Sequence, residues 1–132
     1  NPAKIAAAVR ALQEQHPRVL AVWRPHGFGP LECMQDELID VFRDVPRRAD
    51  RVCLLPVYYA GGTPGGALTS AAFAERARGA GAAVEVLEPA ALADFWSSTA
   101  AAGDACLLMG ARDPGLPGLA RAAVQALQFR GA

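Results

Sequence analysis

The sequence predicts a three-layer α/β/α domain with a mainly parallel sheet. Four short apolar runs alternate along the chain with stretches of helical periodicity, an order typical of parallel sheets with right-handed crossovers. Each run is almost continuously apolar, as expected of strands that are buried on both faces. The length of 132 residues and the hydrophobic fraction of 52% fit one domain with its own core. The pattern is Rossmann-like, and we expect a single domain over residues 1–132.

The expected strands cover residues 19–23, 52–58, 84–87 and 105–109. A helix should precede the first strand, because Asn1 is a favoured N-cap residue and Pro2 is favoured in a first helical turn. One helix is expected between the first two strands, where apolar residues recur at three- and four-residue steps over residues 31–45.

The later helices are delimited by residues with known positional preferences. Thr69 or Ser70 should cap a helix that ends at the glycines of residues 79–81. Pro89 should begin the next helix, and the last amphipathic helix should begin near Leu116.

Composition argues against several classes of function. Thirteen basic and thirteen acidic residues give a formal net charge of +0 with no long basic run, so we expect no nucleic-acid binding. The three cysteines form no Cys-x-x-Cys pair, which favours core residues in a reducing compartment over zinc or redox sites. No apolar stretch approaches the ~20 residues of a membrane helix, and no signal peptide is recognisable. We therefore expect a cytoplasmic protein without membrane contact.

The candidate site residues lie in loops at the predicted carboxyl ends of the strands, where ligands of open parallel sheets bind. These candidates are, in chain order, Arg24, His26, Gly27, Tyr58, Tyr59, Gly61, Gly62 and Arg112. Glycines let a backbone approach a ligand closely, aromatic rings and imidazoles stack and form hydrogen bonds, and arginine grips carboxylates or phosphates.

Each candidate also has a purely structural interpretation. His26 could hold its own loop by a hydrogen bond, and one of two neighbouring strand tyrosines would face the core. The glycine run lacks the Lys-Ser/Thr ending of a P-loop, so it could be a plain flexible loop. Residues 110–115 could form a turn with a surface ion pair, which is the favoured interpretation of Arg112. The other histidine, His16, should cap a helix end, and no Ser-His-Asp set can be assembled.

Four segments resemble, in order and spacing, the C-terminal domain of the Mur ligase family, nearest to its L-alanine-adding branch. Residues 1–5 (Asn-Pro-Ala-Lys-Ile) resemble the end of the family's Asp-Asp-Tyr-Gly-His-His-Pro segment. Residues 20–26 end in Trp-Arg-Pro-His and resemble its Val-Phe-Gln-Pro-His. Residues 50–62 end in Val-Tyr-Tyr-Ala-Gly-Gly and resemble Val-Tyr-x-Ala-Gly-Glu, and residues 103–111 resemble Asp-x-x-Leu-x-x-Gly-Ala-Gly.

The resemblance implies a three-domain ligase of peptidoglycan precursor synthesis. Its first domain holds a UDP-sugar, its central domain carries the P-loop and binds ATP and magnesium, and its third domain presents an amino acid or peptide. A carboxylate becomes an acyl phosphate and then an amide. This chain would be the third domain and would be inactive alone. Its partners would be the other two domains of the full-length protein. By the same resemblance Asn1 would help to bind the cofactor, and the eight loop candidates would bind substrate. The family places the first two strands side by side, so His26, Tyr58 and Tyr59 are expected near one another at the carboxyl ends of these strands.

The sequence departs from the family pattern where the amine substrate is expected. Arginines follow the Pro-His pair in alanine-adding ligases, whereas Gly27 and Pro30 stand here. We expect Arg24 and Arg112 to replace those cations, and an amine larger than alanine to be used. The alternative is a stand-alone, non-catalytic small-molecule or protein-binding module, because this kind of fold serves many functions.

Overall fold

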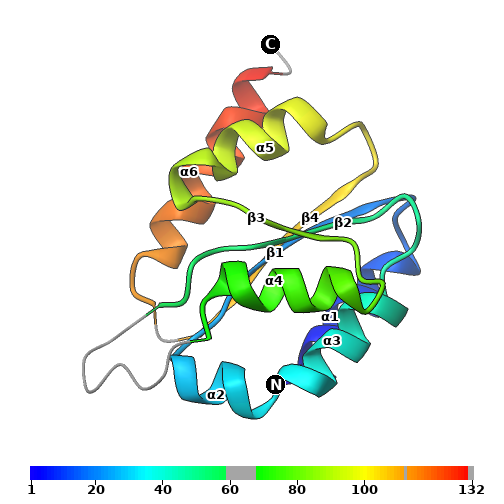
Figure 1. Ribbon diagram of the computed structural model, residues 1–132. Helices are drawn as coiled ribbons and strands as arrows, with labels where there is room; N and C mark the ends of the chain where they lie inside the picture. Colours follow the sequence, from blue (N-terminus) through cyan, green and yellow to red (C-terminus); the bar gives the residue numbers. More distant parts are fainter. Residues whose placement is uncertain (59–67, 112, 131–132) are drawn as a thin grey trace.

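One parallel sheet forms the centre of the molecule. The computed structural model describes residues 1–58, 68–111 and 113–130. The strands are β1 (Val19–Arg24), β2 (Arg51–Leu54), β3 (Val84–Val86) and β4 (Ala105–Gly110). They lie in the order β3-β2-β1-β4, and each pairing between them is parallel (Figure 1). The predicted parallel sheet is therefore confirmed.

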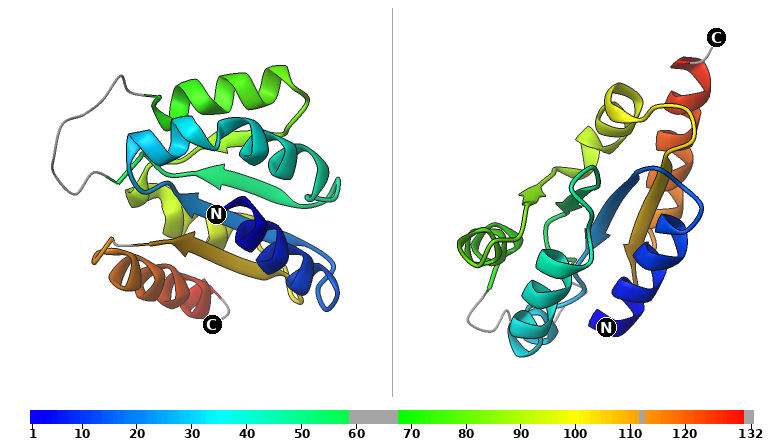
Figure 2. Two further views of the ribbon diagram at one scale, coloured as in Figure 1. Left: turned by 90° about the horizontal axis from the view of Figure 1, so that it is seen from below. Right: turned by 90° about the vertical axis from the view of Figure 1, so that its right-hand side faces the viewer.

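Helices cover both faces of this sheet. On one face lie α1 (Pro2–Gln13), α3 (Gln35–Asp44) and α4 (Ser70–Gly79), and on the other lie α5 (Leu92–Thr99) and α6 (Leu116–Arg130) (Figures 1 and 2). Two short helices, α2 (Phe28–Cys33) and η1 (Pro89–Ala91), begin the connections after β1 and β3. The three-layer architecture predicted from the alternating pattern is confirmed.

The central strand β1 is buried on both faces. Val19, Ala21 and Trp23 belong to the core beneath α1, α3 and α4, whereas Leu20 and Val22 belong to the core beneath α5 and α6. Successive strand residues face opposite sides, so a strand covered on both sides must be apolar throughout. This burial explains why the run showed no polar alternation.

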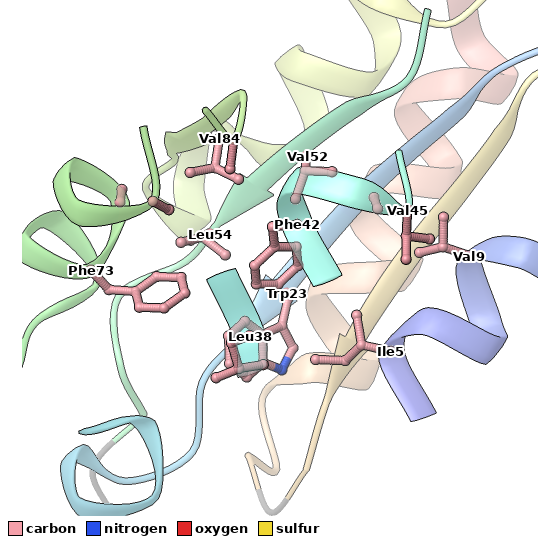
Figure 3. Close-up of a cluster of buried hydrophobic side chains, with 14 of the residues drawn as sticks. Ile5, Val9, Trp23, Leu38, Phe42, Val45, Val52, Leu54, Phe73 and Val84 are labelled. Carbon is pink, nitrogen blue, oxygen red and sulfur yellow. The ribbon is translucent and has the colours of Figure 1, made fainter. Parts of the chain in front are cut away.

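Aromatic packing dominates the core beneath α1, α3 and α4. The rings of Trp23 and Phe42 lie 5.6 Å apart between centroids, and Phe42 meets Phe73 edge to face at 6.1 Å (Figure 3). These three rings join β1, α3 and α4. Such pairs add to the free energy gained from burial alone.

Two predicted elements differ most from those observed, and the other strands agree to within one residue at each end. The single helix expected over residues 31–45 is interrupted at Met34, whose φ of −103° and ψ of 8° leave the helical region, so α2 and α3 are separate. Both pieces still bury an apolar face, through Leu31 and Leu38, and periodicity alone therefore did not show the break. The second strand ends at Leu54 because Pro56 follows and has no N–H to donate to a neighbouring strand.

The predicted caps are largely confirmed. Asn1 Oδ1 accepts hydrogen bonds from the backbone N–H groups of Ala3 (2.9 Å) and Lys4 (3.3 Å), and Thr69 caps α4. His16 is different, because its Nδ1 lies 2.8 Å from the carbonyl oxygen of Gly103. The imidazole therefore forms a hydrogen bond with the loop before β4 and does not cap the helix that precedes it.

The described helices do not combine the length and apolarity that crossing a bilayer requires.

Candidate functional site

An open pocket lies where β1 and β4 end, beside the N-terminus of α1. Its volume is about 460 Å³. The connection that leaves β1 crosses one face of the sheet through α3, and the connection that enters β4 crosses the other face through α5. Adjacent strands with connections on opposite faces form a topological switch point, where open α/β sheets bind ligands. The position of this pocket makes it the candidate ligand site.

The pocket combines an apolar wall with a few polar side chains. The apolar wall is formed mainly by Ile5, Trp23, Leu31, Met34, Leu108 and Met109. The polar side chains that line it are Asn1, Lys4, Arg24 and His26. Among the described lining residues none is acidic. Small-molecule sites are typically of this kind, largely apolar with a few polar groups that orient the ligand.

His26 and Tyr58 lie side by side, as the two loops were predicted to do. The N–H of Tyr58 donates to the carbonyl of Pro25 at 2.8 Å, and the N–H of Gly27 donates to the carbonyl of Tyr58 at 3.0 Å. The two rings lie 6.2 Å apart between centroids. Only His26 of this pair lines the pocket, and Tyr58 lies beside it. The predicted proximity is confirmed for these two residues, whereas Tyr59 lies outside the described residues.

Arg24 forms an ion pair with Asp113 at the edge of the pocket. Its Nη1 lies 3.1 Å from Asp113 Oδ2, and the two side chains are 20% and 8% exposed. The guanidinium carbon lies 5.8 Å from the ring centroid of Tyr58. Asp113 Oδ1 accepts a hydrogen bond of 2.8 Å from the N–H of Gly115, which orients the carboxylate. The loop after β4 thus contributes an ion pair, but its partner is on β1 and the pair is largely buried.

The remaining predicted site residues have different positions. Gly27 does not line the pocket. It is the residue before α2 and has a φ of 78°, and a Cβ added to it would lie 3.3 Å from Pro30 Cδ. Asn1 lines the pocket while its side-chain oxygen Oδ1 caps α1. The other three predicted residues, Gly61, Gly62 and Arg112, lie outside the described residues.

Sequence reasoning missed Lys4 as a pocket residue. Lys4 is exposed, lies in the first turn of α1 and lines the pocket together with Asn1. A signal was present, because a residue three positions after an N-cap belongs to the same first turn as the cap. The apolar wall could not be assembled from the sequence, because it comes from α1, β1, α2 and β4.

The described residues show no metal centre, and one of the described cysteines, Cys53, is a buried core thiol. No cluster of three or more His, Cys, Asp or Glu side chains in this part of the chain has the arrangement of a metal site. Burial, together with the nearby Glu85 carboxylate, raises the pKa of the Cys53 thiol to about 11, despite an opposing effect of Arg51. Cys53 is therefore protonated at neutral pH and unreactive, as the prediction of a core cysteine implies.

The chain is similar in sequence to proteins of known function. No protein-family model matches the chain. The chain is 35% identical over 114 residues to the UDP-N-acetylmuramate–L-alanine ligase of Allorhizobium ampelinum, a match that covers 84% of this chain and 23% of that ligase. The corresponding ligase of Rhizorhabdus wittichii is 34% identical over 116 residues (86% of this chain and 24% of the ligase), and that of Rhodopseudomonas palustris is 35% identical over 114 residues (84% and 24%).

The chain spans about a quarter of the length of the curated relatives that it matches. The matched segment nevertheless covers most of the α/β domain described above. The chain is therefore a domain of the Mur ligase family, distantly homologous to part of the UDP-N-acetylmuramate–L-alanine ligases.

Proposed function

We propose that this chain is the C-terminal domain of a cytoplasmic, ATP-dependent amide-forming ligase of peptidoglycan precursor synthesis. One observation carries the proposal: three segments that resemble the Mur ligase family, far apart in sequence, converge on one pocket. They are represented there by Asn1, His26 and Ala111. The names of the homologous ligases support the same reaction. In this proposal the pocket holds the amine substrate.

The proposed reaction has two steps. ATP phosphorylates the carboxylate of a UDP-sugar substrate, and ADP leaves. The amine nitrogen then attacks the acyl carbon, a C–N bond forms, the C–O bond to phosphate breaks, and the amine releases a proton to solvent. This chain contributes by holding the amine in position, since orientation of two reactants supplies a large part of such a barrier reduction.

ATP and magnesium belong mainly to another domain of the full-length protein in this proposal. The described residues of this chain supply no carboxylate cluster that fits a magnesium ion, and no catalytic step is assigned to a metal here. Asn1 is proposed as the contact to the nucleotide, because it lines the pocket and the helix cap uses its side-chain oxygen Oδ1 and not its side-chain amide nitrogen. The other two domains and the UDP-sugar are the proposed partners.

The predicted substrate residues have different roles in this proposal. His26 lines the pocket and is proposed to contact the amine substrate. Gly27 and Tyr58 are proposed to shape the loop that carries His26, through the hydrogen bonds between them. Arg24 forms part of the pocket wall. Roles for Tyr59, Gly61, Gly62 and Arg112 rest on the family resemblance alone.

The test is amide formation by the full-length protein. ADP release and the mass of the product should be measured with ATP, UDP-N-acetylmuramate and a panel of amino acids and dipeptides. His26→Ala should lower kcat/KM for the amine roughly ten- to hundredfold, the loss expected for about 1.5–3 kcal/mol of a substrate contact. His16→Ala is the matched control, because its ring contacts the loop before β4, away from the pocket. Ligand binding without ATP-dependent ligation would instead identify a binding module.

A further inference from the structure

We propose that Lys4 binds the anionic group of the ligand in this pocket, and that the ligand is an amine bearing a carboxylate and an apolar side chain larger than that of alanine. The inference rests on the proposed function, because it assigns a ligand class to the same pocket. It also replaces the expectation that Arg24 would grip the carboxylate.

Lys4 is a cation of the pocket without a carboxylate partner among the described residues. The pocket is lined by three basic side chains, those of Lys4, Arg24 and His26, and by no acidic side chain among the described residues. Lys4 is exposed, and the first turn of α1 contains no acidic residue. No described carboxylate lies within ion-pair distance of its ammonium group. The side chain is also the single lysine of the chain. An anion entering the pocket therefore meets a positive charge that no described carboxylate neutralises.

Arg24 already has a carboxylate partner, Asp113. Its Nη1 is bound to the carboxylate of Asp113, which is only 8% exposed. Its Nε is buried and has no hydrogen-bond partner among the described residues, so it is shielded from a ligand in the pocket. A ligand carboxylate that took over the guanidinium would leave Asp113 unpaired in a poorly solvated position, and an unpaired buried charge is strongly unfavourable. The exchange of one carboxylate for another would bring no gain in charge neutralisation.

The apolar wall indicates what accompanies the carboxylate. Ile5 lies one residue from Lys4, and Leu31, Met34 and Met109 complete the wall. The volume of about 460 Å³ lies in the range of sites for whole small molecules, and the methyl group of alanine would leave much of this wall uncovered. A larger apolar side chain covers it and removes more nonpolar surface from water. The pocket therefore fits leucine-like amino acids or short apolar peptides.

The experiment measures steady-state kinetics of the full-length ligase with Lys4→Met and Lys4→Arg. The probes are L-alanine, L-leucine, L-phenylalanine, L-alanyl-L-leucine and L-lysine, together with the amide of the best substrate, which lacks the carboxylate. We expect an apolar probe larger than alanine to give the highest kcat/KM. Lys4→Met should raise its KM about ten- to hundredfold while kcat and the KM for ATP change little. Lys4→Arg should restore part of the loss, and the amide should show no dependence on Lys4.

Arg10→Met provides the matched control, because it removes an exposed cation at the other end of α1 that does not line the pocket. A second variant tests why Arg24 is unavailable. Asp113→Asn removes the competing carboxylate, so the double variant Lys4→Met/Asp113→Asn should recover part of the lost affinity. Absence of recovery would show that the ion pair with Asp113 is not the reason why Arg24 does not bind the ligand carboxylate. Circular dichroism and thermal unfolding of each variant should separate these effects from misfolding.

The outcomes distinguish this inference from the proposed function. If the wild-type protein ligates an amine but Lys4→Met and Arg10→Met have the same KM, the role of Lys4 is wrong and the proposed function stands. If Lys4→Met raises the KM for ATP instead, the anion is a phosphate and the inference is overturned. A preference for L-alanine or L-lysine would overturn the assigned ligand class. No ligation of any amine would contradict the proposed function itself.

Discussion

The carboxylate of Asp50 accepts a hydrogen bond of 2.8 Å from the backbone N–H of Val19 and thereby fastens the start of β1 to the loop before β2. The same carboxylate accepts from the side chain of Gln13 at 3.0 Å and from the backbone N–H of Arg47 at 2.8 Å. The Arg47 guanidinium completes the arrangement as an ion pair, and the Asp50 side chain is only 1% exposed. Asp50 thus joins α1, β1 and the β2 loop at the end of the sheet opposite the pocket.

Removal of this carboxylate should destabilise the domain. Asp50→Ala leaves the Val19 N–H and the Arg47 donors without their acceptor, and we expect a loss of about 2–4 kcal/mol in the free energy of unfolding. The measurement is urea denaturation followed by circular dichroism. Asp44→Ala is the control, since Asp44 forms an exposed ion pair with Arg43 and should leave the free energy nearly unchanged. Equal effects of the two substitutions would contradict this assignment.

The contribution of Asp50 should disappear in acid. Burial by itself raises the pKa of Asp50, but hydrogen bonds from Arg47, Val19 and Gln13 outweigh it and hold the pKa below the ordinary value. A carboxylate with a lowered folded-state pKa stabilises the protein above its unfolded pKa, and this stabilisation is lost as pH falls through the folded pKa. The stability difference between wild type and Asp50→Asn should therefore be constant above about pH 4 and shrink below it. A difference unchanged down to pH 2 would contradict the expectation.

The ion pair between Arg24 and Asp113 should be energetically coupled. A double-mutant cycle with Arg24→Met and Asp113→Asn should give an interaction free energy of about 0.5–3 kcal/mol, because both side chains are largely shielded from water. The exposed pair between Arg51 and Glu85, at 41% and 61% exposure, should give about 0–1 kcal/mol in the same measurement. A coupling at Arg24 no larger than at Arg51 would mean that burial does not strengthen the pair.

Gly110 should resist the addition of a single methyl group. A Cβ at this position would lie 2.5 Å from Leu116 Cδ1 and 3.4 Å from the Arg24 carbonyl oxygen, so α6 packs where the side chain would be. Gly110→Ala should cost about 1–3 kcal/mol of unfolding free energy through overpacking. The same change in a Leu116→Ala background should cost less, because the colliding atom is gone. Thermal unfolding of the four proteins checks this, and an equal cost in both backgrounds would refute it.

The 132-residue chain by itself should fold but form no amide. The expectation follows from the proposal that ATP and magnesium are bound mainly by another domain. ADP release should be measured for this chain and for the full-length protein, with ATP, UDP-N-acetylmuramate and the same amines. Circular dichroism establishes that the chain is folded in the assay. Robust ligation by the chain alone would contradict the proposal that ATP and magnesium are bound mainly by another domain.

Much of the fold was predictable because the burial of a strand or helix determines which residues occur within that segment of the sequence. A strand covered on both faces must be apolar at each position, and that run is visible without knowledge of its neighbours, as in β1. Helix caps are equally local, and Asn1 and Thr69 were recognised for that reason. The break at Met34 was missed because α2 and α3 both keep an apolar face towards the core, so the periodicity continues across it.

The sequence by itself determined the layered α/β class. The proximity of His26 and Tyr58 was expected from the resemblance to the Mur ligase family, which places the strands before these two residues side by side. Only the tertiary structure decided which charges are free in the pocket. Arg24 meets Asp113 across 89 positions of sequence because β4 pairs with β1 in the register that sets Arg24 opposite Gly110. Lys4 reaches the same pocket because α1 packs on the sheet with its first turn at the strand ends. Strand order and helix placement are long-range properties, and no local pattern records them.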